Sequence, residues 1–337
     1  MPPDGLRENS PPAEFLAGPT GGEWQSDQTL KRRLDAYARH RSRADAMAEY
    51  IEGSAEGPYL AKLIGSLRTC GRSLEWRHYY SQGKSSLLRA RTCKKHHLCP
   101  MCASLRGLRL AAAYRDRVEL VMRGDSKLLL RMITVTVKDG PDLGERFNHL
   151  HDAWRILRKR DARGNAPTVW NQIVGAVWSY EAKRGANSGE WHPHIHALAL
   201  CRGEVNPFDL SEQWRGITGD SFMVDVRPLT ADQTGAFCEV FKYALKFGDL
   251  PLTDNFSAWQ ILQGRRLVAS SGVLRGIDPG DSLMDPEEDD PRSYDLLFHF
   301  VPTVVDRDTG EVVPSPHYRF VGVNPSPSSI ARGRGGE

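Results

Sequence analysis

Apolar residues recur at helical spacing in several parts of the chain. The segment 30–53 has helix-forming composition and ends in Gly53. The segment 102–122 places apolar residues three to four positions apart with arginines between them, which predicts a basic amphipathic helix. Further helices are predicted at 143–160, 207–217, 232–247 and 255–270.

Other segments are apolar and rich in β-branched residues, which is typical of strands. They are 128–137, 168–181, 191–200 and 222–229. The Gly- and Asn-containing turn AKRGANSG separates the second from the third and predicts a hairpin. The order βαββαβα predicts an α+β fold with an antiparallel sheet of the ferredoxin-like or RNA-recognition-motif kind. The chain has no GxGxxG or phosphate-loop motif, which argues against a doubly wound nucleotide-binding fold.

These patterns divide the chain into five regions. We predict a disordered lead-in at 1–28, a helical region at 29–66, a basic metal-binding segment with its helix at 67–125, the sheet domain at 126–250, and a helix, acidic segment and flexible tail at 251–337. Residues 70–102 are polar and lack a core-like pattern, so a cross-link such as a bound metal ion is expected to hold their shape. A short pair of strands is predicted at 302–314.

Composition excludes several classes of protein. The chain has 337 residues, of which 40% are hydrophobic, and this apolar content is too high for wholesale disorder. No apolar run approaches the ~18 residues of a membrane span, and the first 15 residues lack the pattern of a signal peptide. We therefore expect a soluble cytoplasmic protein with no membrane partner.

The net charge of +3 hides an uneven distribution. Residues 84–131 contain 12 basic and 3 acidic side chains, a local net charge of +9, whereas residues 278–311 contain 11 acidic and 2 basic ones, a local net charge of −9. Such asymmetry is expected of a protein that binds a polyanion, although two solvated faces would give the same counts.

Four of the six cysteines fall within 33 residues of one another. Thiolates with this spacing suit a tetrahedral zinc ion, whereas the alternative is a redox-active or buried pair. We predict a structural zinc site with these ligands: Cys70, Cys93, Cys99 and Cys102. His96 or His97 can replace Cys70 as the fourth ligand. Cys201 and Cys238 lie in apolar surroundings and are expected to be inert core residues.

Three histidines alternate along one predicted strand: His192, His194 and His196. Because side chains alternate between the faces of a strand, all three share one face. A hairpin turn centred near residues 186–187 would place Glu181 opposite or next to His192 on that face, as a carboxylate ligand. Such a mixed nitrogen and oxygen site suits Mg or Mn in enzymes that act on nucleic acids.

The predicted helix at 232–247 contains the sequence EVFKYALK. Glu239, Tyr243 and Lys246 are spaced so that they project from one helical face. A tyrosine hydroxyl with a pKa of ~10 is a poor nucleophile at neutral pH unless a cation or a metal-polarised phosphate lies close. The alternative is an ordinary surface pair on an amphipathic helix.

Taken in order, these motifs resemble those of a known family. CKKHHLCPMC followed by an arginine-rich helix, then ITVTVKDG, WHPHIHALAL and EVFKYALK, is similar to the rolling-circle plasmid replication initiators of the single-tyrosine kind, which are HUH endonucleases. The match covers about residues 70–246. One departure lies at 94–98, where relatives show arginine before Leu-Cys-Pro, and it leaves the role of His97 open between DNA contact and metal binding.

The resemblance implies specific roles. His194 and His196 would bind the catalytic Mg or Mn, with Glu181 as a third ligand. Tyr243 would attack a phosphodiester at the double-strand origin and form a 5′-phosphotyrosine. Glu239 would activate water or assist the terminating cleavage, and Lys246 would stabilise charge on the phosphate. ITVT, at 133–136, would be a sheet strand with no chemistry of its own.

The implied partner is plasmid origin DNA, duplex and single-stranded, and the basic segment would hold its backbone. The residues assigned to this contact are Lys94, Lys95, Arg106 and Arg109. We hypothesise that host replication proteins such as a helicase and a polymerase contact the acidic segment or the N-terminal helix. Three alternatives are a transposase or relaxase, a noncatalytic zinc-dependent nucleic-acid-binding protein, and a small-molecule metallohydrolase.

Overall fold

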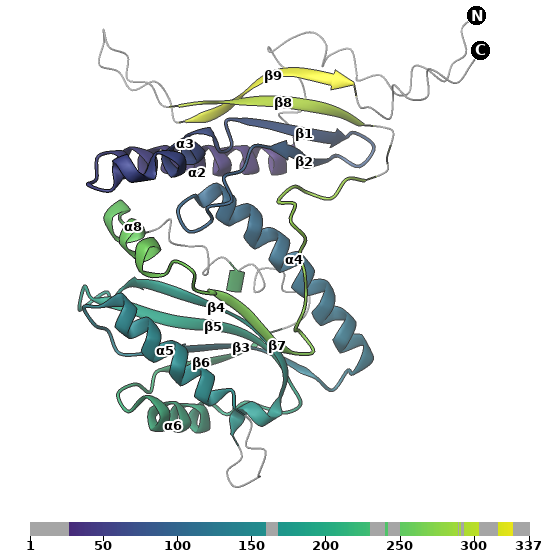
Figure 1. Ribbon diagram of the computed structural model, residues 1–337. Helices are drawn as coiled ribbons and strands as arrows, with labels where there is room; N and C mark the ends of the chain where they lie inside the picture. Colours follow the sequence, from purple (N-terminus) through teal and green to yellow (C-terminus); the bar gives the residue numbers. More distant parts are fainter. Residues whose placement is uncertain are drawn as a thin grey trace, which may run out of the picture. The chain divides into compact units, whose positions relative to one another are not determined.

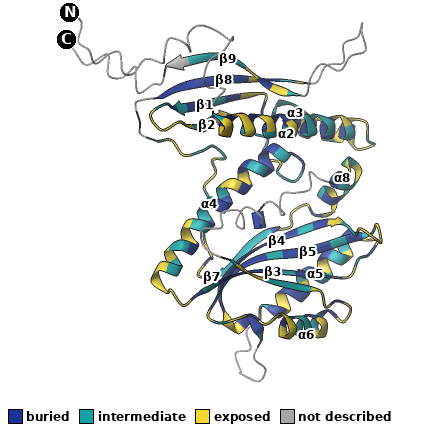
Figure 2. Cartoon of the chain, turned by 180° about the vertical axis from the view of Figure 1, so that it is seen from behind, coloured by how far each residue is buried: buried dark blue, intermediate teal, exposed yellow. Residues whose placement is uncertain are grey.

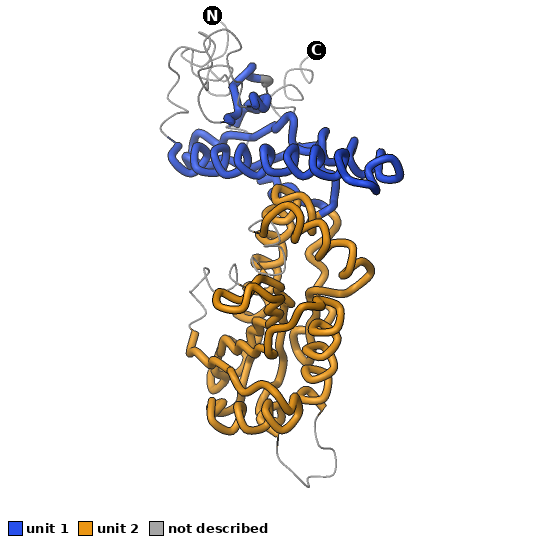
Figure 3. Tube along the Cα trace, turned by 90° about the vertical axis from the view of Figure 1, so that its left-hand side faces the viewer, with its two compact units in different colours: residues 1–95, 282–337 blue, residues 96–281 orange. Residues whose placement is uncertain are grey.

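The computed structural model describes residues 27–159, 168–229, 240–241, 250–288, 290, 293–302 and 316–325. The chain forms two compact units, which are residues 1–95 with 282–337 and residues 96–281 (Figure 3). The sequence-based regions have boundaries at 66/67, 125/126 and 250/251, whereas the units meet at 95/96 and 281/282. The described residues 27–95 and those from 282 onward therefore belong to one unit although they are far apart in the sequence.

The unit of residues 96–281 is built on a five-stranded antiparallel sheet (Figure 1). Its strands are β3 (Leu129–Thr136), β4 (Ile173–Arg184), β5 (Trp191–Cys201), β6 (Val224–Leu229) and β7 (Val268–Gly272). They lie in the order β6-β3-β5-β4-β7. The four predicted strands thus have the order 4-1-3-2, and the predicted α+β class with an antiparallel sheet is confirmed.

Helices pack on both faces of this sheet. They are α4 (Pro100–Gly124), α5 (Leu143–Leu157), α6 (Pro207–Thr218) and α8 (Leu252–Ile261). Buried residues of α5, α6 and α8 pack against Ile133, Val135 and Ile195 on one face, whereas α4 packs against Met132 and Leu198 on the other. Figure 2 shows how deeply the central strands are buried.

The second face is not apolar along its whole length. Towards one end of β3 and β5 its apolar residues give way to threonines and histidines: Thr134 and Thr136 follow Met132, and His194 and His196 precede Leu198. Because side chains alternate along a strand, these polar residues share the face on which α4 packs. The candidate site is therefore an extension of one core face.

The predicted helix at 255–270 is wrong in its second half. α8 ends at Ile261, and Val268–Gly272 forms edge strand β7 beside β4. Gly264 has a φ of 73° and turns the chain between the two elements. Most of the predicted helix at 232–247 lies outside the described residues, where Val240 and Phe241 alone are described, and both are helical.

The other unit contains α2 (Gln28–Glu52), a 3-10 turn (Gly57–Leu60), α3 (Ala61–Thr69) and a four-stranded antiparallel sheet. The strands are β1 (Ser73–Tyr79), β2 (Lys84–Ala90), β8 (Ser293–Val301) and β9 (His317–Pro325), in the order β2-β1-β8-β9. Asp27 caps α2 by accepting hydrogen bonds from the backbone of Thr29 and Leu30. Among the described helices, none combines the length and the apolar character needed to cross a bilayer.

This sheet corrects one expectation and gives a structural role to part of the acidic segment. Residues 70–102 were expected to lack a core, but they contain the β1–β2 hairpin, and its Leu74, Trp76 and Leu87 are fully buried. Part of the acidic segment is strand β8, in which Asp295 is buried and pairs with Arg77 of β1 at 2.7 Å. The predicted strand pair at 302–314 lies outside the described residues from 303 onward.

Candidate metal centres

The β4–β5 hairpin determines which residues meet at the histidine face. Gly185 donates a backbone hydrogen bond to Glu190, and Gly189 takes a φ of 66° in the loop between the strands. The register pairs Glu181 with His194 and Lys183 with His192. The predicted register is thus wrong by two residues, because the turn lies further along the chain than expected. An even shift keeps Glu181 on the histidine face, as predicted.

Three side chains converge there. The Nε2 atoms of His194 and His196 lie 2.5 Å and 3.2 Å from Oε2 of Glu181. The ligand atoms of all three residues lie within 4.8 Å of one another, and the side chains are only 3%, 14% and 11% exposed. Two imidazole nitrogens and one carboxylate oxygen form a donor set that fits a divalent cation such as Mn or Mg.

The charge states of these groups also suit a metal. Burial alone would raise the pKa of Glu181, but hydrogen bonds from His194 and His196 lower this pKa to about 2. Burial lowers the pKa of His194, which outweighs the opposing effect of Glu181. An ionised carboxylate beside a neutral imidazole is the combination that metal binding requires.

His192 has a different partner. Its Nδ1 lies 2.5 Å from Oδ1 of Asp139, and the other carboxylate oxygen of Asp139 accepts a hydrogen bond from Ser188 at 2.5 Å. The ring centroids of His192 and His194 are 5.5 Å apart. The described group of three ligands does not include His192, so its predicted role as a ligand stays a prediction.

The residues predicted to act as nucleophile and helpers, Glu239, Tyr243 and Lys246, lie outside the described residues. Two residues between Glu239 and Tyr243 in the sequence, Val240 and Phe241, are described. Ser179 donates a hydrogen bond of 2.6 Å to the carbonyl oxygen of Val240, and Ser179 is the β4 residue paired with His196. Val240 therefore lies on the metal-site face of the sheet, one strand away from a candidate ligand.

The four predicted zinc ligands also form one group. The sulfur atoms of Cys70, Cys93, Cys99 and Cys102 lie within 4.8 Å of one another, and His96 and His97 are not in this group. Three of the four residues are buried, and none forms a disulfide. Four thiols at this separation fit a tetrahedral zinc ion.

Local backbone conformation supports this cysteine group. Gly71 and Lys94, the residues that follow Cys70 and Cys93, both have a left-handed backbone with φ of 66° and 56°. The backbone N–H of Cys93 donates to the sulfur of Cys70 at 3.4 Å. A left-handed residue thus follows each member of the first pair of cysteines.

The second pair belongs to the start of a helix. Cys99 is the N-cap residue of α4, Pro100 occupies its first turn, and Cys102 lies in the same turn. Cys201, in contrast, is fully buried in the sheet core, and burial raises the pKa of its thiol to about 11. This agrees with an unreactive core cysteine.

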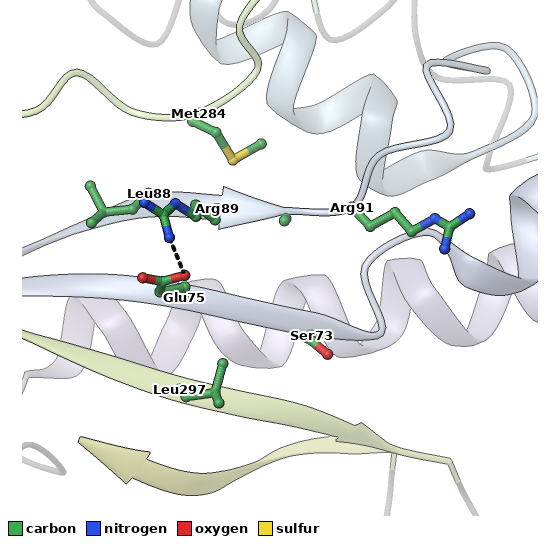
Figure 4. Close-up of a pocket in the computed structure, with 8 residues that line it drawn as sticks. Ser73, Glu75, Leu88, Arg89, Arg91, Met284 and Leu297 are labelled. Carbon is green, nitrogen blue, oxygen red and sulfur yellow. Dashed lines mark ion pairs between the residues drawn. The ribbon is translucent and has the colours of Figure 1, made fainter. Parts of the chain in front are cut away.

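The predicted DNA contacts differ in exposure. Lys94, Lys95 and Arg106 are exposed, and Arg109 is partly buried. Upstream of them, Arg89 and Arg91 border a cavity of about 310 Å³ whose apolar wall includes Leu297 (Figure 4). Arg89 also faces Glu75 at 3.5 Å.

The predicted basic and acidic segments meet within the first unit. Lys84 forms an ion pair with Glu288, and Arg77 lies 3.6 Å from Glu287. Asp285 accepts hydrogen bonds from Arg33 of α2 at 2.8 Å and from the backbone of Leu87 at 2.7 Å. Part of the acidic segment is therefore used to hold this unit together.

Comparison with known proteins identifies the family. A family model described as "Replication protein" matches residues 84–296, which is more than half of the chain. The chain belongs to this replication protein family. The resemblance to plasmid rolling-circle replication initiators is thereby confirmed, and the matched range includes β4, β5 and both candidate histidine ligands.

Three curated relatives of this replication protein are each named "Protein rep". The one from Streptococcus pneumoniae serotype 2 is 25% identical over an alignment of 252 residues that covers 69% of this chain and 76% of the relative. One from Bacillus amyloliquefaciens is 24% identical over 78% of this chain and 90% of its own length. One from Bacillus sp is 25% identical over 72% and 88%. No solved structure matches the chain.

Proposed function

We propose that this replication protein starts rolling-circle replication by nicking one strand of the plasmid's double-strand origin. The observation that carries the proposal is the largely buried Glu181, His194 and His196 group, in which His194 is buried, together with the Ser179–Val240 hydrogen bond beside it. Val240 precedes Tyr243 by three positions in the sequence. The candidate ligand group for a divalent ion and Val240 thus lie on the same sheet face.

Each described residue has a definite task in this proposal. His194 and His196 present their Nε2 atoms, and Glu181 presents a carboxylate oxygen, to hold Mg or Mn. When bound, the ion supplies Lewis-acid polarisation of a phosphoryl oxygen. Because the three side chains extend from neighbouring strands of one sheet, they are held in place without needing substrate to order them.

In the covalent step, the hydroxyl oxygen of Tyr243 attacks the scissile phosphorus and loses its proton. The bond from phosphorus to the 3′-oxygen breaks, and that oxygen takes up a proton to become the 3′-OH that primes synthesis. The 5′-phosphate stays on Tyr243 as a phosphodiester, so the reverse attack can rejoin ends. Lys246 would stabilise the charge on the phosphate, and Glu239 would activate water or assist the terminating cleavage.

Binding of origin DNA is assigned to the basic segment. A zinc ion held by the four cysteines would fix the shape of that segment, and its Lys94, Lys95 and Arg106 would contact phosphates of duplex and single-stranded origin DNA. Arg109, which is partly buried, would contribute less. A host helicase and a polymerase are further proposed partners of the initiation complex.

The decisive experiment is a nicking assay on a supercoiled plasmid that carries the origin. Wild-type protein with Mn or Mg is expected to relax the plasmid and to become covalently attached to the 5′ end, whereas Tyr243→Phe is expected to do neither. Tyr59→Phe is the matched control, because Tyr59 is 88% exposed in the other unit.

The same assay separates the alternatives. Origin binding without nicking or a covalent adduct would favour a noncatalytic zinc-dependent nucleic-acid-binding protein. Plasmid maintenance that persists with Tyr243→Phe would contradict replication initiation by this chemistry and would favour a transposase or relaxase role.

A further inference from the structure

Strand β3 contributes a side chain to the edge of the metal group. Thr134 pairs with His196 in the β3–β5 register, and its hydroxyl Oγ1 lies 3.1 Å from Nδ1 of His196. One row of paired residues therefore crosses three strands on this face, from Ser179 through His196 to Thr134. The opposite nitrogen of His196, Nε2, is directed at Glu181.

A histidine that ligates a metal through Nε2 must carry its proton on Nδ1, and that proton needs an acceptor. For His194 the acceptor is the backbone carbonyl of His192, at 3.3 Å from Nδ1. For His196 the atom in the corresponding place is Oγ1 of Thr134, since a hydroxyl oxygen can accept as well as donate.

We infer that Thr134 is a positioning residue, which fixes the tautomer and the ring orientation of His196 so that its Nε2 lone pair faces the metal position. The inference rests on the divalent-ion site proposed above and extends it to a third strand. It also gives a chemical role to the segment at 133–136, which the resemblance leaves without one.

The same strand supplies a matched control. Thr136 lies two residues further along on the same face, is similarly half-buried, and pairs with His194. Its hydroxyl is 3.5 Å from the carbonyl oxygen of Met223 and has no described bond to a histidine ring. Because His194 already has a backbone acceptor, removal of the Thr136 hydroxyl is not expected to affect the metal group.

The test is calorimetric titration of the full-length protein with Mn²⁺. Thr134→Val is expected to weaken Mn²⁺ binding about 10–100-fold, the range that loss of an outer hydrogen-bond partner of a ligand typically causes. Thr134→Ser, which restores the hydroxyl, and Thr136→Val are expected to bind Mn²⁺ like the wild type. Equal affinity of Thr134→Val and wild type would overturn the inference.

A second measurement reports the tautomer directly. Nitrogen-15 NMR of histidine-labelled protein, at a concentration of diamagnetic Mg²⁺ that saturates the wild type, is expected to show His196 protonated on Nδ1 in the wild type and a mixture of tautomers in Thr134→Val. An unchanged tautomer in that variant would also overturn the inference. Failure of the proposed metal site would give a different result. The wild-type protein would then bind Mn²⁺ no more tightly than His194→Ala/His196→Ala does.

Discussion

The two candidate metal groups are assembled in different ways. Glu181, His194 and His196 extend from paired strands, so the register of one hairpin brings them together. Of the cysteines, Cys70 and Cys93 are each followed by a residue with left-handed backbone, whereas Cys99 and Cys102 belong to the start of a helix. The first group is held by two paired strands, and the second by a connecting segment and the start of a helix.

The two groups also differ in the chemistry of their ligands. A set of four thiols completes a tetrahedral zinc site and leaves no position for a substrate, whereas two imidazoles and one carboxylate leave positions open on a Mg or Mn ion. We therefore expect the histidine group to serve the reaction and the cysteine group to serve the structure. Removing each group should then produce separate effects.

The largest effect is expected from His194→Ala/His196→Ala in the nicking assay. Loss of the ion should remove about 4 kcal/mol of transition-state stabilisation, which is a rate decrease of about 1000-fold. Zinc content, measured by atomic absorption, should stay unchanged. Nicking at more than about a tenth of the wild-type rate would contradict the assignment of this group to the reaction.

A smaller effect, on stability, is expected from Cys99→Ser. The variant should lose its zinc and about 3 kcal/mol of folding free energy, so its Tm should fall by about 6–12 °C. Cys201→Ala is the control, because Cys201 is buried outside the cluster and its variant should keep the zinc. A zinc-free wild-type protein after native purification would rule out a structural zinc at this position.

The histidine group could be predicted from sequence because the face that its residues share does not depend on the exact position of the hairpin turn. Alternation places His194 and His196 on one face wherever the hairpin turns, and a register error of two residues left Glu181 on that face. The cysteine group could be predicted for a similar reason, since the spacing of Cys99 and Cys102 is local.

The pairing of strands that are far apart in the sequence could not be predicted from local patterns. β1 pairs with β8, in which Asp295, the partner of Arg77, lies 218 residues further along the chain. No local pattern in 70–102 reveals such a partner, so the segment reads as lacking a core. The ion pair of Arg77 with Asp295 has the same origin, and it gives part of the acidic segment a structural task.

The smallest effect on Mn²⁺ affinity is expected at His192, and it tests whether this residue belongs to the histidine group. Because its Nδ1 is engaged by Asp139, and it lies outside the group of three, His192→Asn should change Mn²⁺ affinity less than about threefold. Asparagine keeps an N–H donor close to the position of Nδ1, so the contact with Asp139 can persist. His196→Asn, the matched change at a ligand, should weaken binding by more than about 100-fold. Titration of both variants compares them directly: a loss at residue 192 as large as that at residue 196 would make His192 a fourth ligand, and the sheet site would then have fewer positions open to a phosphate.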